Sequence, residues 1–210
     1  MKPLVSVITP TWLRHDWLLH RCMPSVQGQT YPHIEHIIVS DGPDPELAVL
    51  MKDLQRLAPV LAPKIIFEEL PDHEPTQHWG NRCRLRALEL ASGSLIAYID
   101  DDDRLYPRHV DLLARPLLER PELMWVYSQM YSHGAAAVGD YVVAGPPANG
   151  SIGTPMLMHR PELLEVATWG SATGDSSTED WELVSAWMQS GAPYDKVSEV
   201  TCEVWPSAHR

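Results

Sequence analysis

The sequence predicts an α/β fold with a mostly parallel β-sheet that helices cover on both faces. Short apolar runs, each bounded by Pro, Gly, Asp or Ser, recur as far as Tyr131. Segments of helical length with apolar spacings of three and four lie between these runs. Alternating strands and helices favour a parallel sheet, which binds ligands beyond the carboxyl ends of its strands.

Each element has its own signal in the sequence. The apolar runs predict strands at Leu4–Thr9, Ile34–Ser40, Lys64–Phe67, Leu95–Ile99, Met124–Tyr127 and Glu199–Val204. Apolar spacing predicts helices at Trp17–Val26, Pro45–Leu57, Trp79–Ala91, Arg108–Glu119, Pro161–Val166 and Thr178–Gly191. The Gly- and Pro-rich stretch Ser132–Pro155 interrupts the alternation and predicts a hairpin or loop region that shapes a substrate-specific surface.

Charge and cysteine content limit the classes of function. The 16 basic and 28 acidic residues give a net charge of −12, which argues against broad binding of nucleic acid. The cysteines, Cys22, Cys83 and Cys202, are widely spaced, which favours a reducing compartment over a disulfide scaffold or a zinc site. With no signal-peptide pattern and no apolar run of about 20 residues, we expect a cytoplasmic protein; peripheral association with a membrane surface stays open.

Four consecutive aspartates, Asp100 to Asp103, follow the apolar strand Leu95–Ile99. In a parallel sheet this is a carboxyl end, where ligands bind. Adjacent carboxylates repel one another, and Mg²⁺ or Mn²⁺ would relieve the repulsion because these hard cations take oxygen ligands. The alternative is a solvated loop in which Asp103 caps the next helix.

Further acidic candidates lie at strand and helix ends. Asp41 ends the second expected strand, although it could equally be an ordinary turn residue before Gly42. Glu179 and Asp180 open the last helix, where a rigidly held carboxylate could act as general base toward an incoming hydroxyl. The alternative is a capping box between Ser176 and Glu179.

Four segments in order carry a family resemblance. They are VSVITPTWLR, SVQGQTYPHIEHIIVSDG, LASGSLIAYIDDDDRLYP, and GTPMLMHRPELLE with the later STEDWELVSAWMQSG. Together they resemble the family-two glycosyltransferases of the GT-A fold, which move a sugar from a nucleotide diphosphate to an acceptor. The resemblance implies one GT-A domain over 1–210, with a nucleotide-sugar-binding half (1–105) and an acceptor-side half (106–210) that includes a small antiparallel subregion.

The resemblance also implies which residues bind the nucleotide. Pro10, Thr11, Trp12 and Arg14 fall in the nucleotide loop, where Trp12 would pack on the base. Asp41 falls where an aspartate hydrogen-bonds the base edge. The donor implied is a UDP-sugar.

The aspartates and one arginine match further family positions. Asp100, Asp101 and Asp102 match the D-x-D motif, with Asp101 facing the ribose and Asp102 binding Mn²⁺ or Mg²⁺. His209 falls where a histidine completes the metal site, and Arg84 corresponds to the arginine of the A-R-N segment. Because the sequence has no P-loop and no G-x-G-x-x-G, phosphate binding must depend on metal and arginine.

Asp180 matches the catalytic base and Glu179 its acceptor-contacting partner, which implies an inverting single displacement. Two departures concern the donor site: Ser40 replaces the first Asp of "DDGS", and "CRLRA" replaces "ARNxG". One alternative is a non-catalytic nucleotide-sugar or glycan-binding module of the same fold. Another is a nucleotidyltransferase, whose Gly-rich basic loop is missing from "TPTWLRHDW". The acceptor stays open and includes glycan, lipid-linked, protein and other macromolecular hydroxyls.

Overall fold

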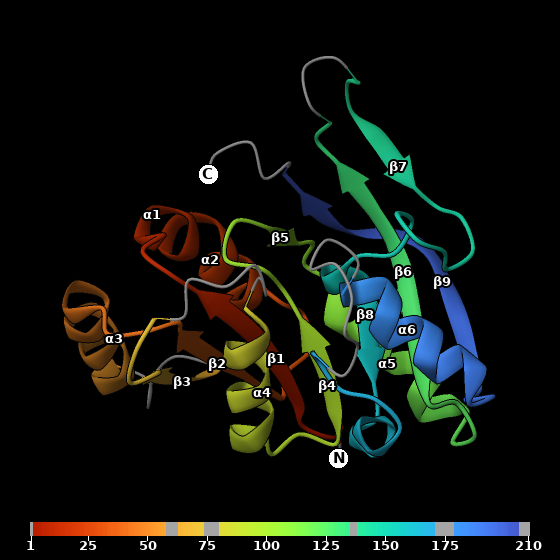
Figure 1. Cartoon of the computed structure of the whole chain (residues 1–210), viewed down its shortest axis with the longest axis horizontal. Helices are drawn as coiled ribbons and strands as arrows, with labels where there is room; N and C mark the ends of the chain where they lie inside the picture. The colour runs from red at the N-terminus through yellow and green to blue at the C-terminus, as the bar shows by residue number, and fades with distance from the viewer. Residues whose placement is uncertain (1, 58–62, 74–79, 135–137, 171–178, 206–210) are drawn as a thin grey trace.

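The computed structural model describes residues 2–57, 63–73, 80–134, 138–170 and 179–205 (Figure 1). The strands are β1 (Val5–Thr11), β2 (Ile34–Ser40), β3 (Lys64–Glu69), β4 (Leu95–Tyr98), β5 (Arg104–Leu105), β6 (Trp125–Ser132), β7 (Tyr141–Val143), β8 (Leu157–His159) and β9 (Tyr194–Val204). The α-helices are α1 (His15–Trp17), α2 (Met23–Gln27), α3 (Pro45–Leu57), α4 (Asn81–Leu90), α5 (His109–Glu119) and α6 (Glu179–Gln189). A π-helix, η1 (Leu18–Cys22), joins α1 to α2, and two 3₁₀ helices are η2 (Thr154–Met156) and η3 (Pro161–Glu165).

The N-terminal half of the sheet is parallel, in the order β3-β2-β1-β4. Every residue of β1, β2 and β4 is buried, which agrees with the predominance of apolar and β-branched residues in these strands, although β1 and β2 also bury polar side chains such as Glu35 and His36. All their carboxyl ends therefore lie at one edge of the sheet.

The second half of the sheet continues with β8, β6, β9 and β5, and β7 pairs with β6. β8 runs antiparallel to both β4 and β6, whereas β6 and β9 are parallel. Because β8 is antiparallel to β4, the residues before β8 lie at the edge where β4 ends. The chain thus brings a later segment to the carboxyl edge of the parallel strands.

Helices cover both faces of this sheet. In Figure 1, α4 and α6 lie in front of the sheet and α5 lies behind it. The core under α6 is aromatic: Trp125 and Trp187 have ring centroids 5.9 Å apart, and Trp187 lies 4.8 Å from His159. This packing fixes α6, and with it the residues at its first turn, against the centre of the sheet.

The expected fold class is confirmed, with local differences. The predicted helix Trp17–Val26 is instead irregular, because Pro24 has no N–H to donate inside a helical run and the preceding turn widens into the π-helix. The segment Pro161–Glu165 is a 3₁₀ helix, and β9 begins at Tyr194 rather than at Glu199. The region expected as hairpin or loop contains β7. This strand and the end of β6 with which it pairs extend away from the rest of the sheet (Figure 1).

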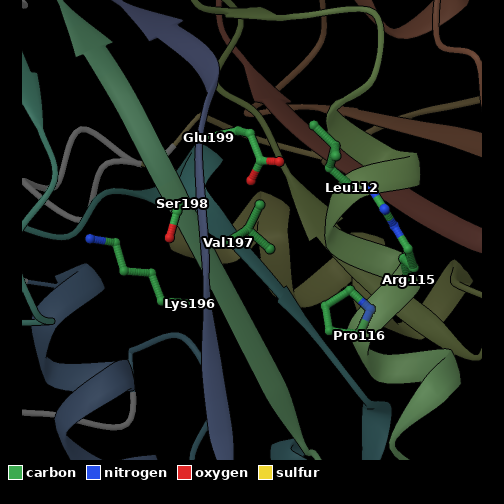
Figure 2. A pocket seen from close by; sticks show the side chains of 7 residues that line it. All are labelled: Leu112, Arg115, Pro116, Lys196, Val197, Ser198 and Glu199. Atoms are coloured by element: carbon green, nitrogen blue, oxygen red, sulfur yellow. The ribbon is translucent and has the colours of Figure 1, made fainter.

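A hollow of about 300 Å³ lies between α5 and β9 (Figure 2). Its walls are Leu112, Arg115 and Pro116 of α5 and the segment Lys196–Glu199 of β9. The β6–β9 register shifts between Tyr127 and Gln129, opposite this segment. The hollow therefore lies beside an irregularity in the pairing of β6 and β9.

Candidate functional site

The predicted donor-site residues meet at the carboxyl edge of the parallel strands. In the β1–β2 register Thr11 lies opposite Ser40, so the loop after β1 and Asp41 emerge side by side. Ile8 lies opposite Tyr98 in the β1–β4 register, which brings Asp100 to the same edge. The shared edge expected from the sequence is thus present.

Arg14 binds two of the four aspartates. Its Nη1 donates to Asp101 Oδ1 at 3.0 Å and to Asp102 Oδ2 at 2.8 Å, while Thr11 Oγ1 donates to Asp101 Oδ2 at 2.7 Å. Leu13, just before the arginine, has a φ of 51°, a left-handed conformation that is uncommon for a residue other than glycine. The loop after β1 therefore accepts backbone strain where it turns Arg14 toward the aspartates.

Burial disfavours the ionised form of the two aspartates that Arg14 contacts, although Arg21 also donates to the Asp102 backbone oxygen at 2.7 Å. Burial raises the pKa of Asp101 to about 6, although Arg14 and Thr11 oppose the shift. Burial and the neighbouring Asp100 also raise the pKa of Asp102. The cluster therefore has the charge and the oxygen donors to accept a further cation.

The alternative role of Asp103 as a helix cap is wrong. α5 begins six residues after the last aspartate, at His109, and its N-cap residue Arg108 makes no side-chain capping bond. Asp103 Oδ1 instead accepts a hydrogen bond from the backbone N–H of Trp205 at 3.2 Å. This aspartate therefore joins the end of β9 to the aspartate loop.

The residues expected to bind the base form a second cluster. Trp12 stacks on His73 with ring centroids 4.4 Å apart and planes 5° apart. His73 Nδ1 lies 2.8 Å from Asp41 Oδ2, and Arg82 Nη1 lies 3.8 Å from Asp41 Oδ1. Gly42 has a φ of 119° and a Cβ there would lie 2.8 Å from the His73 backbone nitrogen, so the close approach requires glycine.

Arg84 joins the aspartates to the start of α6. Its side chain is 2% exposed, and its two terminal nitrogens donate to Asp100 Oδ1 and to Glu179 Oε1, both at 2.7 Å. The guanidinium also lies over the Trp169 ring, 4.6 Å from its centroid. Burial lowers the pKa of Arg84, but the Asp100 and Glu179 carboxylates more than offset that effect and raise it.

The two acidic residues of α6 lie at the same site. Thr154 Oγ1 donates to Asp180 Oδ1 at 2.6 Å. Burial raises the pKa of Glu179 to about 7 against the opposing charge of Arg84, and burial also raises the pKa of Asp180. Ser176, the other member of the expected capping box, lies outside the described residues.

The expected metal ligands are only partly described. Asp102 is 21% exposed at its side chain, whereas His209 lies outside the described residues. Within the described part of the chain, no group of three or more His, Cys, Asp or Glu side chains is arranged to hold a metal ion. Nor does this part contain a helix long and apolar enough to cross a membrane.

Sequence reasoning missed two polar residues of the site, His73 and Thr154. His73 follows the third strand, and a polar residue beyond the carboxyl end of a parallel strand could have been recognised as a candidate ligand-binding residue. Thr154 precedes a three-residue strand and had no such signal.

Comparison with known proteins identifies the family. A family model described as "Glycosyl transferase family 2" matches residues 6–135, more than half of the 210 residues. The chain belongs to glycosyl transferase family 2. The match contains the loop after β1, Asp41, Arg84 and the four aspartates, and it ends before Asp180.

Curated relatives of this family 2 chain include two bacterial proteins with polysaccharide names. One is WcaA of Escherichia coli K12, named as a colanic acid biosynthesis glycosyl transferase, which is 30% identical over 69% of this chain and 45% of its own length. The other is TuaG of Bacillus subtilis 168, named for teichuronic acid biosynthesis, which is 30% identical over 49% of this chain and 37% of its own length. The chain thus spans less than half the length of either relative.

Solved structures share the fold of this family 2 chain. The mannosyltransferase PcManGT from Pyrobaculum calidifontis, in complex with GDP-Man and Mn²⁺, has a TM-score of 0.74 at 16% identity over 99% of this chain and 59% of its own. S. aureus TarS residues 1–349, in complex with UDP, have a TM-score of 0.69 at 15% identity over 97% of this chain and 61% of that one. At these identities the likeness shows the GT-A fold alone.

Proposed function

We propose that the chain is an inverting, metal-dependent glycosyltransferase that moves a sugar from a UDP-sugar to an acceptor hydroxyl. One observation carries the proposal: Arg84 joins Asp100 of the D-x-D motif to Glu179, beside Asp180, through two 2.7 Å bonds. Family membership supports glycosyl transfer, and the contacts of Arg84 with both Asp100 and Glu179 support a single site for donor and acceptor.

Asp180 is the proposed general base. It would take the proton of the acceptor hydroxyl while the oxygen attacks the anomeric carbon from the side opposite the departing diphosphate. Glu179, held by Arg84, would contact the acceptor beside it. Because one displacement occurs at the anomeric carbon, the product has inverted configuration.

The nucleotide would bind between the loop after β1 and Asp41. Trp12 offers an aromatic face to the base, and the Asp41 carboxylate can only accept hydrogen bonds, so it suits a base N–H donor. In the structure His73 stacks on Trp12 and contacts the Asp41 carboxylate, so a bound nucleotide base must share these two contacts with His73 or displace it.

The chemistry of the residues present fits a divalent cation, since the partly exposed Asp102 and its neighbouring aspartates supply carboxylate oxygens. Asp102 would hold Mn²⁺ or Mg²⁺ together with the donor's diphosphate oxygens, with His209 as the proposed second protein ligand. A bound cation supplies electrostatic stabilisation of the departing diphosphate. Arg14 already contacts Asp102, so it would share that carboxylate or release it.

The test is a thermal-shift screen of UDP-glucose, UDP-N-acetylglucosamine and GDP-mannose with Mn²⁺ or with EDTA, followed by turnover of the donor that binds. We expect stabilisation by a UDP-sugar with Mn²⁺ only. Asp180→Asn should keep donor affinity and lose about 10²- to 10⁴-fold in turnover, the usual contribution of a positioned general base. Donor binding without turnover by the unmodified protein would instead support a non-catalytic module, and stabilisation by GDP-mannose alone would contradict the UDP assignment.

A further inference from the structure

Thr154 reaches the proposed base because of the strand order. It begins the 3₁₀ helix η2, which leads into β8. β8 runs antiparallel to β4, with Ala97 opposite Met158, so the residues before β8 lie beside the end of β4 and Asp100. Thr154 therefore belongs to the ligand-binding edge although its strand runs in the opposite direction.

The Thr154 side chain is held rigidly. It is 3% exposed, and its β-branched side chain has few favourable rotamers. The backbone on either side is also constrained: Pro155 follows it and is buried, and a Cβ on the preceding Gly153 would lie 3.2 Å from Met130 Sδ. A hydroxyl on such a support can fix the orientation of its partner.

We propose that Thr154 is a positioning residue that orients the Asp180 carboxylate for proton abstraction, an inference that rests on the proposed function. Its hydroxyl donates to Asp180 Oδ1 at 2.6 Å and its backbone also hydrogen-bonds this carboxylate, so that Oδ2 is the oxygen that would face the acceptor. In the step, the acceptor proton moves to Oδ2, the acceptor oxygen bonds to the anomeric carbon, and the bond from that carbon to the diphosphate oxygen breaks. The bonding electrons leave with the nucleoside diphosphate.

Other charged groups also act on Asp180. Arg84 from α4 favours the ionised carboxylate, as the Thr154 hydroxyl does, whereas burial and Asp100 at the end of β4 oppose ionisation. Glu179, next to it on α6, is a further acidic neighbour. Loss of the hydroxyl therefore leaves the other groups in place and raises the pKa of Asp180 further.

The experiment compares Thr154→Val with Thr154→Ser, using UDP-glucose or UDP-N-acetylglucosamine, whichever binds, with Mn²⁺ and water as acceptor. We expect the valine variant to lose about 10- to 100-fold in kcat, as a misplaced catalytic group does. Its donor Kd should not change, and the acidic limb of its kcat–pH profile should move up by about one pH unit. The serine variant should restore both kcat and the limb.

A matched control is Thr201→Val. Thr201 is fully buried on β9; its hydroxyl donates to Ser128 Oγ at 2.6 Å and lies 2.8 Å from His109 Nδ1, and neither partner belongs to the Asp180 network. The Thr201→Val variant should have a lower melting temperature but an unchanged acidic limb in its kcat–pH profile. An unmoved limb in Thr154→Val, equal losses in the valine and serine variants, or a limb shift in the control would overturn the positioning role.

The two proposals fail differently. If Asp180→Asn loses turnover while Thr154→Val keeps it, the inference about Thr154 alone is wrong. If Asp180→Asn turns over normally, or the unmodified protein turns over neither donor, the proposed function is wrong and the inference falls with it.

Discussion

Replacing Arg84 with methionine tests the link between the aspartates and α6. Methionine keeps a long, flexible side chain beside Trp169 but removes both 2.7 Å bonds, to Asp100 and to Glu179. The loss of Arg84 should destabilise the two carboxylates unequally, because the Asp100 side chain is 35% exposed and that of Glu179 is 12% exposed. Most of the cost should therefore fall on Glu179.

The expected cost follows from the burial of the network. Removing one partner of a buried ion pair costs about 3–5 kcal/mol, and since water can replace part of the bond to Asp100, we expect about 3 kcal/mol. For a chain of this length, about 2–4 °C of melting temperature corresponds to 1 kcal/mol. The variant should therefore melt about 6–12 °C lower at pH 8.

The loss should depend on pH. The pKa of Glu179 is about 7 in the fold even with Arg84 opposing the effect of burial, so without the arginine it is higher still. Below that pKa the Glu179 carboxyl is neutral, so its burial without the Arg84 guanidinium costs less than the burial of an unpaired carboxylate. The penalty should accordingly shrink from pH 8 to pH 6, and adding Glu179→Gln to the Arg84→Met variant should recover part of it at pH 8.

Differential scanning calorimetry at both pH values measures the effect, with Arg86→Met as the control. Arg86 lies two residues further along α4 and pairs with Glu68 and Glu89, but its side chain is 37% exposed against 2% for Arg84, so its loss should lower the melting temperature less. An Arg84→Met penalty no larger than that of the control, or one that is equal at both pH values, would refute the reasoning.

Two further predictions concern the carboxylates. The pKa of Glu179 in the folded protein, about 7, exceeds its ordinary value of 4.5, so the stability that Glu179 contributes is present below about pH 4.5 and is lost as pH rises through 7. Denaturant titrations should show the unfolding free energy falling across this pH window by up to about 3 kcal/mol relative to that of Glu179→Gln. Parallel pH curves for the two proteins would contradict the raised pKa of Glu179. Asp102→Asn should weaken Mn²⁺-dependent UDP binding about tenfold or more in calorimetry but leave binding in EDTA unchanged. Unchanged affinity with Mn²⁺ would remove Asp102 as a ligand.

The parallel half of the fold was predictable because buried parallel strands are continuous apolar runs with turn residues at their ends. That pattern located β1, β2 and β4, and hence the common edge of Trp12, Asp41 and Asp100. β8 escaped prediction because Leu157–His159 is too short for a periodic signal, and its place between β4 and β6 depends on pairing with distant segments.

The site contacts that could not be predicted join residues that are distant in the sequence. Arg84 looked like a phosphate contact, and that role stays a prediction, but its burial between Asp100 and Glu179 depends on a helix 95 residues further along. Asp103 looked like a cap for the next helix, yet its partner is the N–H of Trp205, 102 residues away. No local pattern encodes such contacts.

The structure also explains how four adjacent carboxylates can coexist. Asp101 and Asp103 are buried and have fixed partners, in Thr11 and Arg14 for the first and in the N–H of Trp205 for the second.

Asp100 and Asp102 remain 35% and 21% exposed, so the accessible carboxylates alternate along the chain. Arg84 binds Asp100 with one terminal nitrogen and Glu179 with the other, whereas Arg14 approaches Asp102 with a single nitrogen that Asp101 also shares, and Arg14 is itself 29% exposed. We therefore expect an incoming cation to bind Asp102 more readily than the other aspartates, with Arg14 sharing or releasing that carboxylate.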